Sequence, residues 1–217
     1  MRFTSNKHTA ETTKAILGAF PSSLSDDVHT VLKILAVAKH EVSLDTHYSS
    51  YVHVENIVLP YRVYFPPISP KNIQHLTMQQ RSLVAAIMTR HHDGFQREIW
   101  ISELCAYPVD WAVPFIVYAL GDYVVEVQQA IERSINTKWL DLFHDHLAKN
   151  GIECRSLSQR ILTYWTEYYR THDVKMKWLK DYPGFIAATK LGVWDKNVAC
   201  KLLRRQKRRF SKETGVN

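Results

Sequence analysis

The densest group of side chains that could hold a metal ion is the adjacent set His91, His92 and Asp93. Imidazole and carboxylate ligands together suit Zn, Mn or Fe. Because neighbouring residues on a helix point about 100° apart, this set reaches one metal only at a distorted turn. The other interpretation is a connection between two helices, in which Asp93 caps the second helix and the histidines face solvent.

A His residue followed directly by Asp, as in His92 and Asp93, also resembles the core of the HD-type phosphohydrolases, an all-α family of metal enzymes. The resemblance implies a metal-dependent hydrolase whose site needs a further His upstream and a further Asp downstream, on other helices. The candidates for these two positions are His53 or His75, and Asp110 or Asp122. No spacing selects one of them.

A second polar set, His144, Asp145 and His146, lies on a predicted helix. The two histidines are two positions apart and project to roughly opposite sides of a helix, so they do not share a metal without help. Asp141, His144 and Asp145 do share one face of that helix. A solvated polar surface explains this face equally well.

Several enzyme classes lack their sequence signatures in this chain. There is no Gly-x-Ser-x-Gly motif, no glycine-rich phosphate loop and no Cys-x-x-Cys pair. With only 7 glycines, a nucleotide cradle is not expected, and we expect no cofactor. The cysteines Cys105, Cys154 and Cys200 are widely spaced and odd in number, which argues against a disulfide framework and for a reducing cytoplasm.

Membrane insertion and secretion are not expected from the hydropathy pattern. No apolar run approaches the ~20 residues that span a bilayer. The N-terminal residues 1–20 lack a basic region followed by an apolar one, which a secretory signal requires.

The net charge of +7 is concentrated near the C-terminal end. Residues 196–213 hold eight basic residues and one acidic residue, whereas the rest of the chain has 20 of each and is formally neutral. The pI of about 9.3 therefore reflects one segment rather than the whole surface. A concentrated basic patch attracts polyanions such as nucleic acid or an acidic protein face, and a solubilising tail is the alternative.

This basic segment is predicted to form an amphipathic helix over residues 195–210. Its apolar face comprises Trp194, Val198, Ala199, Leu202 and Leu203. The candidate polyanion-binding residues are Lys201, Arg204, Arg205, Lys207, Arg208, Arg209 and Lys212. Such a helix docks through its apolar side and presents its cations outward. Because the apolar side is needed for the core, we do not expect the helix to bind a membrane surface.

Most of the chain has the periodicity of helices. The predicted helices cover residues 6–20, 25–40, 78–89, 95–107, 110–120, 123–135, 139–149, 157–170, 184–191 and 195–210. Thr77 with Gln80 fits a capping box, and Asp93 and Asp195 are expected to cap helices.

One segment, residues 48–65, is instead rich in β-branched and aromatic residues. It predicts a two-stranded hairpin that packs on the helices, with Glu55 and Asn56 as a possible turn. Pro60 restricts the strand that contains it to an edge or a bulge.

Aromatic residues recur at helical spacing in residues 161–169. They are Tyr164, Trp165, Tyr168 and Tyr169, together with the apolar Ile161 and Leu162. The spacing predicts a core stripe first and a platform for stacking nucleobases second.

Two predicted helix pairs are similar to each other, with turns about 29 residues apart at Asp93 and Asp122. A helix pair of this size is typical of stacked solenoid repeats. Residues 112–135 resemble a HEAT repeat. The matching positions are Pro114 in the first helix, Asp122 at the turn, and Val127, Ile131 and Ile135 in the second helix.

Residues 83–104 are a looser relative of the same repeat, with Arg97 at the position where such repeats often carry a basic residue. In the better repeat Gln128 replaces that basic residue, and in the looser one bulky Trp100 stands where a small residue is typical. The resemblance covers about 60 of the 217 residues. It implies stacked antiparallel helical hairpins, a scaffold that mostly binds proteins and in some cases nucleic acid.

These observations predict a mainly all-α chain of HEAT-like helical hairpins with a small β-hairpin near residues 48–65. Three parts are expected: residues 1–70 with the β-rich element, the repeats in 71–193, and the basic helix and tail in 194–217. We expect a cytoplasmic, non-enzymatic interaction module that binds nucleic acid or an acidic protein partner through the basic helix. The alternative is an HD-like metal-dependent hydrolase centred on His91, His92 and Asp93.

Overall fold

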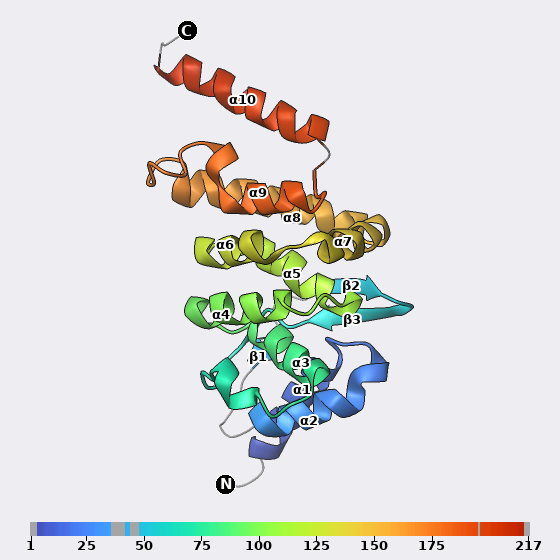
Figure 1. Cartoon of the computed structure of the whole chain (residues 1–217). Helices are drawn as coiled ribbons and strands as arrows, with labels where there is room; N and C mark the ends of the chain where they lie inside the picture. Colours follow the sequence, from blue (N-terminus) through green and yellow to red (C-terminus); the bar gives the residue numbers. More distant parts are fainter. Residues whose placement is uncertain (1–3, 36–41, 44–47, 195, 215–217) are drawn as a thin grey trace. The chain divides into compact units, whose positions relative to one another are not determined.

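The computed structural model describes residues 4–35, 42–43, 48–194 and 196–214. The chain is mainly α-helical, with helices packed against one another and a small β-hairpin, which confirms the predicted fold class (Figure 1). It divides into two compact units, Met1–Ala119 and Leu120–Asn217. The predicted division at residues 70 and 193 stays a prediction. In the described part of the chain, no helix combines the length and the apolar character needed to cross a membrane.

The first unit contains helices α1 to α4, all of α5 except its last residue, and three short 3-10 turns. The helices are α1 (Thr4–Leu17), α2 (Ser25–Leu35), α3 (Met78–Met88), α4 (Gly94–Cys105) and α5 (Val113–Leu120), whose last residue falls in the second unit. The 3-10 turns are η1 (Ser22–Leu24), η2 (Pro70–Ile73) and η3 (Asp110–Ala112).

Local capping signals set the helix starts in this unit. Thr77 and Gln80 form the predicted capping box at the start of α3. The Asp93 side chain accepts a hydrogen bond from Phe95 N and caps α4, also as predicted. Helices α1 and α2 pack on each other, α2 packs on α3, and α3 packs on α4.

The β-hairpin pairs β2 (Tyr48–Val52) with β3 (Glu55–Leu59) in antiparallel register (Figure 1). Its turn lies at residues 53–54, where His53 has a φ of 54°, so the predicted turn at Glu55 and Asn56 is wrong. Glu55 belongs to β3, where it pairs with Val52, and its carboxylate accepts hydrogen bonds from the backbone and hydroxyl of Ser22. A second small sheet pairs β1 (Val42–Ser43) with β4 (Arg62–Val63).

The hairpin packs on the helices of its unit, as predicted. The ring centroid of Tyr48 lies 4.1 Å from that of Tyr118, whose hydroxyl donates to Ser49 O. The buried Arg90 side chain donates to the carbonyls of Pro60 and Tyr61 just after β3. Because β3 ends at Leu59, Pro60 lies outside the ladder, where its missing N–H costs no sheet hydrogen bond.

The regular elements described in the second unit are all helices or helical turns. Its elements are α6 (Val125–Ser134), α7 (Thr137–Lys149), α8 (Gly151–Tyr164), the π-helical turn η4 (Trp165–Tyr169), the 3-10 turn η5 (Leu179–Asp181), α9 (Pro183–Lys190) and α10 (Lys196–Thr214). Helix α8 begins six residues before the predicted start at 157, because neither proline nor glycine follows Gly151 before Tyr164. The predicted cap Asp195 lies outside the described residues.

Helix α9 packs on α6 and α8 in the second unit. Gln128 of α6 is fully buried, and its Nε2 donates to Leu120 O and Asp122 O in the turn before the helix. A Cβ atom at Gly184 would lie 2.7 Å from Oε1 of Gln128, so α9 approaches α6 at a distance that only glycine permits.

Candidate functional site

The basic helix α10 is amphipathic and sits on its unit through one face. Ala199 is buried, and Leu202 and Leu203 are half-buried, as the apolar pattern predicts. Val198, which was predicted on the same face, is 39% exposed. Trp194 is buried just before α10, with its ring centroid 5.0 Å from that of Phe185.

A polar contact that sequence reasoning missed holds the middle of α10. Gln206 Oε1 accepts a hydrogen bond from Leu179 N at 3.0 Å, and Gln206 Nε2 donates to Lys177 O at 3.3 Å. Gln206 follows Leu202 by four positions and Leu203 by three, so it extends the docked face of the helix. The sequence held one indication of this contact, because Gln206 is the one uncharged residue between Arg204 and Arg209.

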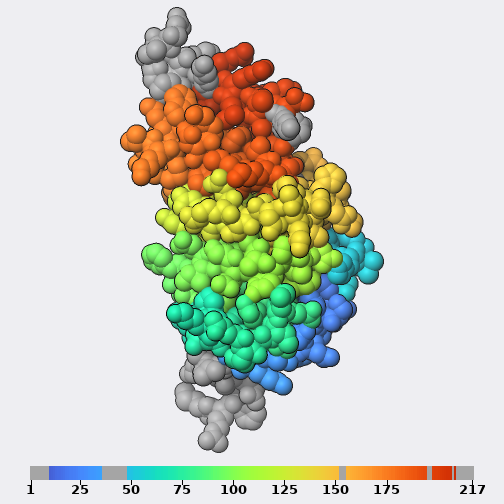
Figure 2. Space-filling view, viewed as in Figure 1, coloured from blue at the N-terminus to red at the C-terminus, as the bar shows by residue number. Residues whose placement is uncertain are grey.

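The other side of α10 presents cations. Lys201, Arg204, Arg205 and Arg208 are exposed, and α10 lies at the surface of the second unit (Figure 2, red). None of the four forms a salt bridge with any described residue. The backbone of Lys207, Arg209 and Lys212 belongs to α10, whereas their side chains lie outside the described residues. The structure therefore brings four of the seven predicted residues onto one exposed helix surface.

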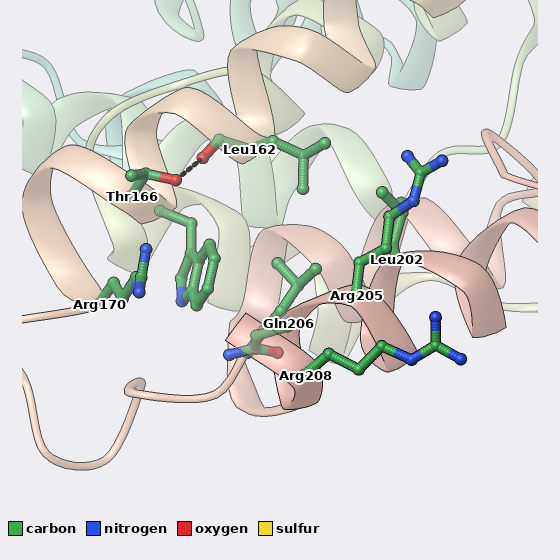
Figure 3. Close-up of a pocket in the computed structure, with 9 residues that line it drawn as sticks. Leu162, Thr166, Arg170, Leu202, Arg205, Gln206 and Arg208 are labelled. Atoms are coloured by element: carbon green, nitrogen blue, oxygen red, sulfur yellow. Dashed lines mark hydrogen bonds between the residues drawn. The ribbon is translucent and has the colours of Figure 1, made fainter. Parts of the chain in front are cut away.

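A pocket of about 500 Å³ lies beside this cationic surface, within the second unit. Helix α8 and η4 form one wall, η5 contributes Leu179, and α10 forms the other wall (Figure 3). We call it the arginine pocket. Its lining residues are Leu162, Trp165, Thr166, Arg170, Leu179, Leu202, Arg205, Gln206 and Arg208. The lining thus combines apolar side chains with three arginines and has no acidic side chain.

Hydrogen-bond donors inside the arginine pocket are used by the protein itself. Thr166 Oγ1 donates to Leu162 O at 2.8 Å (Figure 3), and Trp165 Nε1 donates to Met176 O at 2.8 Å. The guanidinium of Arg170 lies 6.0 Å from the Trp165 ring centroid, a cation–π distance. What this pocket offers a ligand is therefore apolar surface and the positively charged guanidinium groups of Arg205 and Arg208.

The predicted metal ligands lie at the turn between α3 and α4. His91 is fully buried, which corrects the expectation that it faces solvent. Its Nδ1 accepts from Asp93 N at 3.0 Å, so its Nε2 carries the proton and donates to Phe65 O at 2.7 Å. Burial lowers the pKa of His91 and favours this neutral form. The exposed His92 ring stacks on Tyr64 with centroids 4.9 Å apart.

The candidate metal ligands His91 and Asp93 stabilise the turn between α3 and α4. Both ring nitrogens of His91 and the Asp93 carboxylate form hydrogen bonds with backbone groups. Among the described residues, no group of three or more His, Cys, Asp or Glu side chains could hold a metal. Of the further residues nominated for such a site, His53 and Asp110 contact each other, with Nε2 and Oδ2 2.6 Å apart. Asp122 accepts a hydrogen bond from Val124 N.

The residues of the second polar set, on α7, also form contacts within or at the end of their own helix. Asp145 forms a 2.7 Å salt bridge with Lys149 one turn later, and this hydrogen bond lowers the pKa of the exposed carboxyl. His146 is buried, and the Asn150 backbone N–H and side-chain Nδ2 both donate to its backbone carbonyl.

The aromatic stripe of residues 161–169 divides between core and surface. Ile161 and Trp165 are buried, whereas Tyr168 is 55% exposed. A group of tyrosines has neighbouring ring centroids about 5 to 7 Å apart and runs from the exposed Tyr123 and Tyr168 through Tyr164 and Tyr169 to the buried Tyr182. Desolvation and then the nearby carboxylates of Glu126, Asp122 and Asp173 raise the pKa of Tyr169. The negative charge around these rings disfavours a nucleic-acid platform here.

No protein-family description, no curated protein and no solved structure matches the chain.

Proposed function

We propose that the chain is a non-enzymatic interaction module that binds nucleic acid through the basic helix α10. The observation that carries the proposal is the pairing of a docked face with a cationic face on α10. Lys201, Arg204, Arg205 and Arg208 are exposed without a carboxylate partner in the described residues. Four cations on one helix repel each other, and a polyanion relieves that repulsion and releases its counterions.

The scaffold in this proposal is a HEAT-like set of helical hairpins. Its support is that residues 83–104, the looser repeat, belong to two packed helices, α3 and α4, and that Asp93 lies at the turn between them and caps α4. A solenoid scaffold of this kind presents a long surface to an extended partner.

Nucleic acid is preferred over an acidic protein because of the residues beside the cations. All three cations of the arginine pocket are arginines, whose planar guanidinium binds phosphate bidentately and also stacks on bases. The apolar interior next to them suits a ligand with a planar apolar part and a phosphate. The metal-dependent hydrolase at His91, His92 and Asp93 stays a prediction, and metal analysis of the purified chain tests it.

The proposal is tested by fluorescence anisotropy with a labelled oligonucleotide at about 50 and 200 mM salt. The full chain is compared with a variant in which the four exposed cations are neutralised, Lys201→Gln, Arg204→Gln, Arg205→Gln and Arg208→Gln. We expect tight binding at low salt, a steep loss at high salt, and more than a tenfold loss in the variant. Each neutralised cation that contacts a phosphate lowers the salt slope by about one.

A matched control removes the same amount of charge elsewhere, at the exposed residues Lys14, Lys71, Lys138 and Lys175. Each of these is replaced by Gln, so the net charge of the control equals that of the α10 variant. We expect the control to bind nearly as well as the unmodified chain. Equal losses of affinity in both variants would mean that binding depends only on overall charge and would contradict a site on α10. Absence of binding at low salt would overturn the proposal.

A further inference from the structure

The arginine pocket lies beside the cations of α10 and shares Arg205 and Arg208 with them. We propose that it holds one unpaired nucleotide of single-stranded nucleic acid, with the base against the apolar interior and the phosphate on the guanidinium groups. This inference rests on the proposed function of α10 and names the form of nucleic acid that the site selects.

The size and lining of the pocket fit one nucleotide. Small-molecule sites enclose about 300 to 1,000 Å³ and combine apolar walls with a few charged groups, and the arginine pocket measures about 500 Å³. Leu162, Leu179 and Leu202 supply apolar walls, and Trp165 supplies an aromatic one. A nucleobase buries planar apolar surface against such walls.

The polar groups of the pocket that remain available to a nucleotide suit its phosphate rather than its base. Because Thr166, Trp165 and Gln206 already donate to backbone carbonyls, they have little left to distinguish one base edge from another. The exposed guanidinium groups of Arg205 and Arg208 have no partner among the described residues. Binding by apolar contact and charge is tolerant of base identity.

The same geometry discriminates single strands from duplexes. A base in a duplex is paired and stacked, so it enters a pocket only after pairing and stacking are lost, which costs free energy. An unpaired nucleotide enters without this cost. Duplexes are therefore expected to contact the exposed cations of α10 alone.

The first test fills the pocket without changing its charge. Thr166 lines the pocket from an exposed position on η4, so Thr166→Trp occupies the space while it leaves the core intact. The control is Thr163→Trp, which places the same side chain at an exposed position on α8 that does not line the pocket. The probes are labelled oligo(dT) and oligo(dA) single strands and a duplex of equal length, and thermal unfolding checks the fold of each variant.

We expect Thr166→Trp to weaken single-strand binding at least tenfold and to leave duplex binding within about twofold. Thr163→Trp should bind both probes as the unmodified chain does, and oligo(dT) and oligo(dA) should agree within about threefold. If Thr166→Trp binds single strands normally while the α10 cations remain essential, the pocket inference is wrong and the proposed function survives. If no probe binds the unmodified chain, the proposed function itself fails.

A second test separates the pocket cations from the others on the same helix. Arg205 lines the pocket and Arg204 does not, although both are exposed on α10. Arg204→Gln should weaken single-strand and duplex binding equally, whereas Arg205→Gln should weaken single-strand binding several-fold more than duplex binding. Identical losses in the two variants would overturn the pocket assignment. A labelled poly-glutamate peptide that binds the unmodified chain and loses affinity in Thr166→Trp, with oligonucleotides unaffected, would assign the pocket to an acidic peptide instead.

Discussion

Arg97 and Gln128 have the same structural role at two different turns of the chain. Both side chains are buried, and each donates hydrogen bonds to two backbone carbonyls of the turn before its own helix. Arg97 Nη1 lies 2.9 Å from His91 O and 2.8 Å from His92 O. Gln128 Nε2 lies 2.9 Å from two carbonyl oxygens in the turn 120–122. Backbone carbonyls at the C-terminal end of a helix have no hydrogen-bond donor within that helix. In both turns a buried side chain of the following helix provides the donor.

Gln128→Leu is expected to destabilise the second unit by about 1 to 3 kcal/mol, because two buried carbonyls lose their donor. Urea unfolding monitored by circular dichroism measures the change. The neighbouring Gln129, which is only half-buried, gives the control Gln129→Leu, with a change within about 0.5 kcal/mol. Equal effects at the two positions would contradict the role assigned to Gln128.

Gly184→Ala should destabilise the second unit by about 1 to 3 kcal/mol, since the new methyl group would lie 2.7 Å from Gln128 Oε1. The matched variant is Gly151→Ala at the start of α8, where a Cβ meets nothing within 4 Å. That change should be neutral or stabilising, because alanine loses less backbone entropy on folding. Thermal unfolding of the two variants side by side makes the comparison, and a neutral Gly184→Ala would refute the close approach of α9 to α6.

The stability of the first unit should fall in mild acid through His91. Desolvation, the largest cause, lowers its folded pKa below the ordinary 6.5. The unfolded chain therefore binds a proton that the folded chain does not, and stability declines as the pH drops below about 6.5 towards the folded pKa. His91→Gln removes this contribution, so its urea midpoint should depend less on pH between about 7 and 5 than that of the unmodified chain. The exposed neighbour gives the control His92→Gln, which should keep the steeper dependence.

Thiol reactivity should separate the described cysteines. Burial raises the pKa of Cys105 to about 12, so its thiol should resist alkylation until the first unit unfolds. Cys200 is exposed on α10 and should react quickly. A Cys154→Ser background keeps the assay to these two residues, and mass spectrometry after timed iodoacetamide treatment counts the adducts. Fast labelling of Cys105 in the folded chain would contradict its burial.

The sequence predicted elements whose causes are local. The capping box of Thr77 and Gln80 and the cap at Asp93 depend on contacts two or three residues away, so residue order alone reveals them. The docked and cationic faces of α10 follow from the helical period for Ala199, Leu202 and Arg204.

Features that depend on distant contacts were not predictable. The turn of the hairpin lies at residues 53–54, and Glu55, which directly follows it, accepts hydrogen bonds from Ser22, 33 positions earlier. Gln206 and Leu179 both line the arginine pocket and form a hydrogen bond across 27 residues, and no periodicity marks that pairing. A polar residue in the docked face of a basic helix is visible in sequence, but its partner is a backbone N–H that any residue carries.

The link between residues 63–65 and 90–92 has a kinetic consequence. Val63 exchanges backbone hydrogen bonds with Arg90 and His92, and the His91 ring adds its bond to Phe65 O across 26 residues. Closing a loop of that length costs chain entropy before any of these bonds forms. The link should therefore form late, after the transition state for folding. His91→Gln should accordingly accelerate unfolding while it leaves the refolding rate almost unchanged, and stopped-flow chevron measurements resolve the two rates.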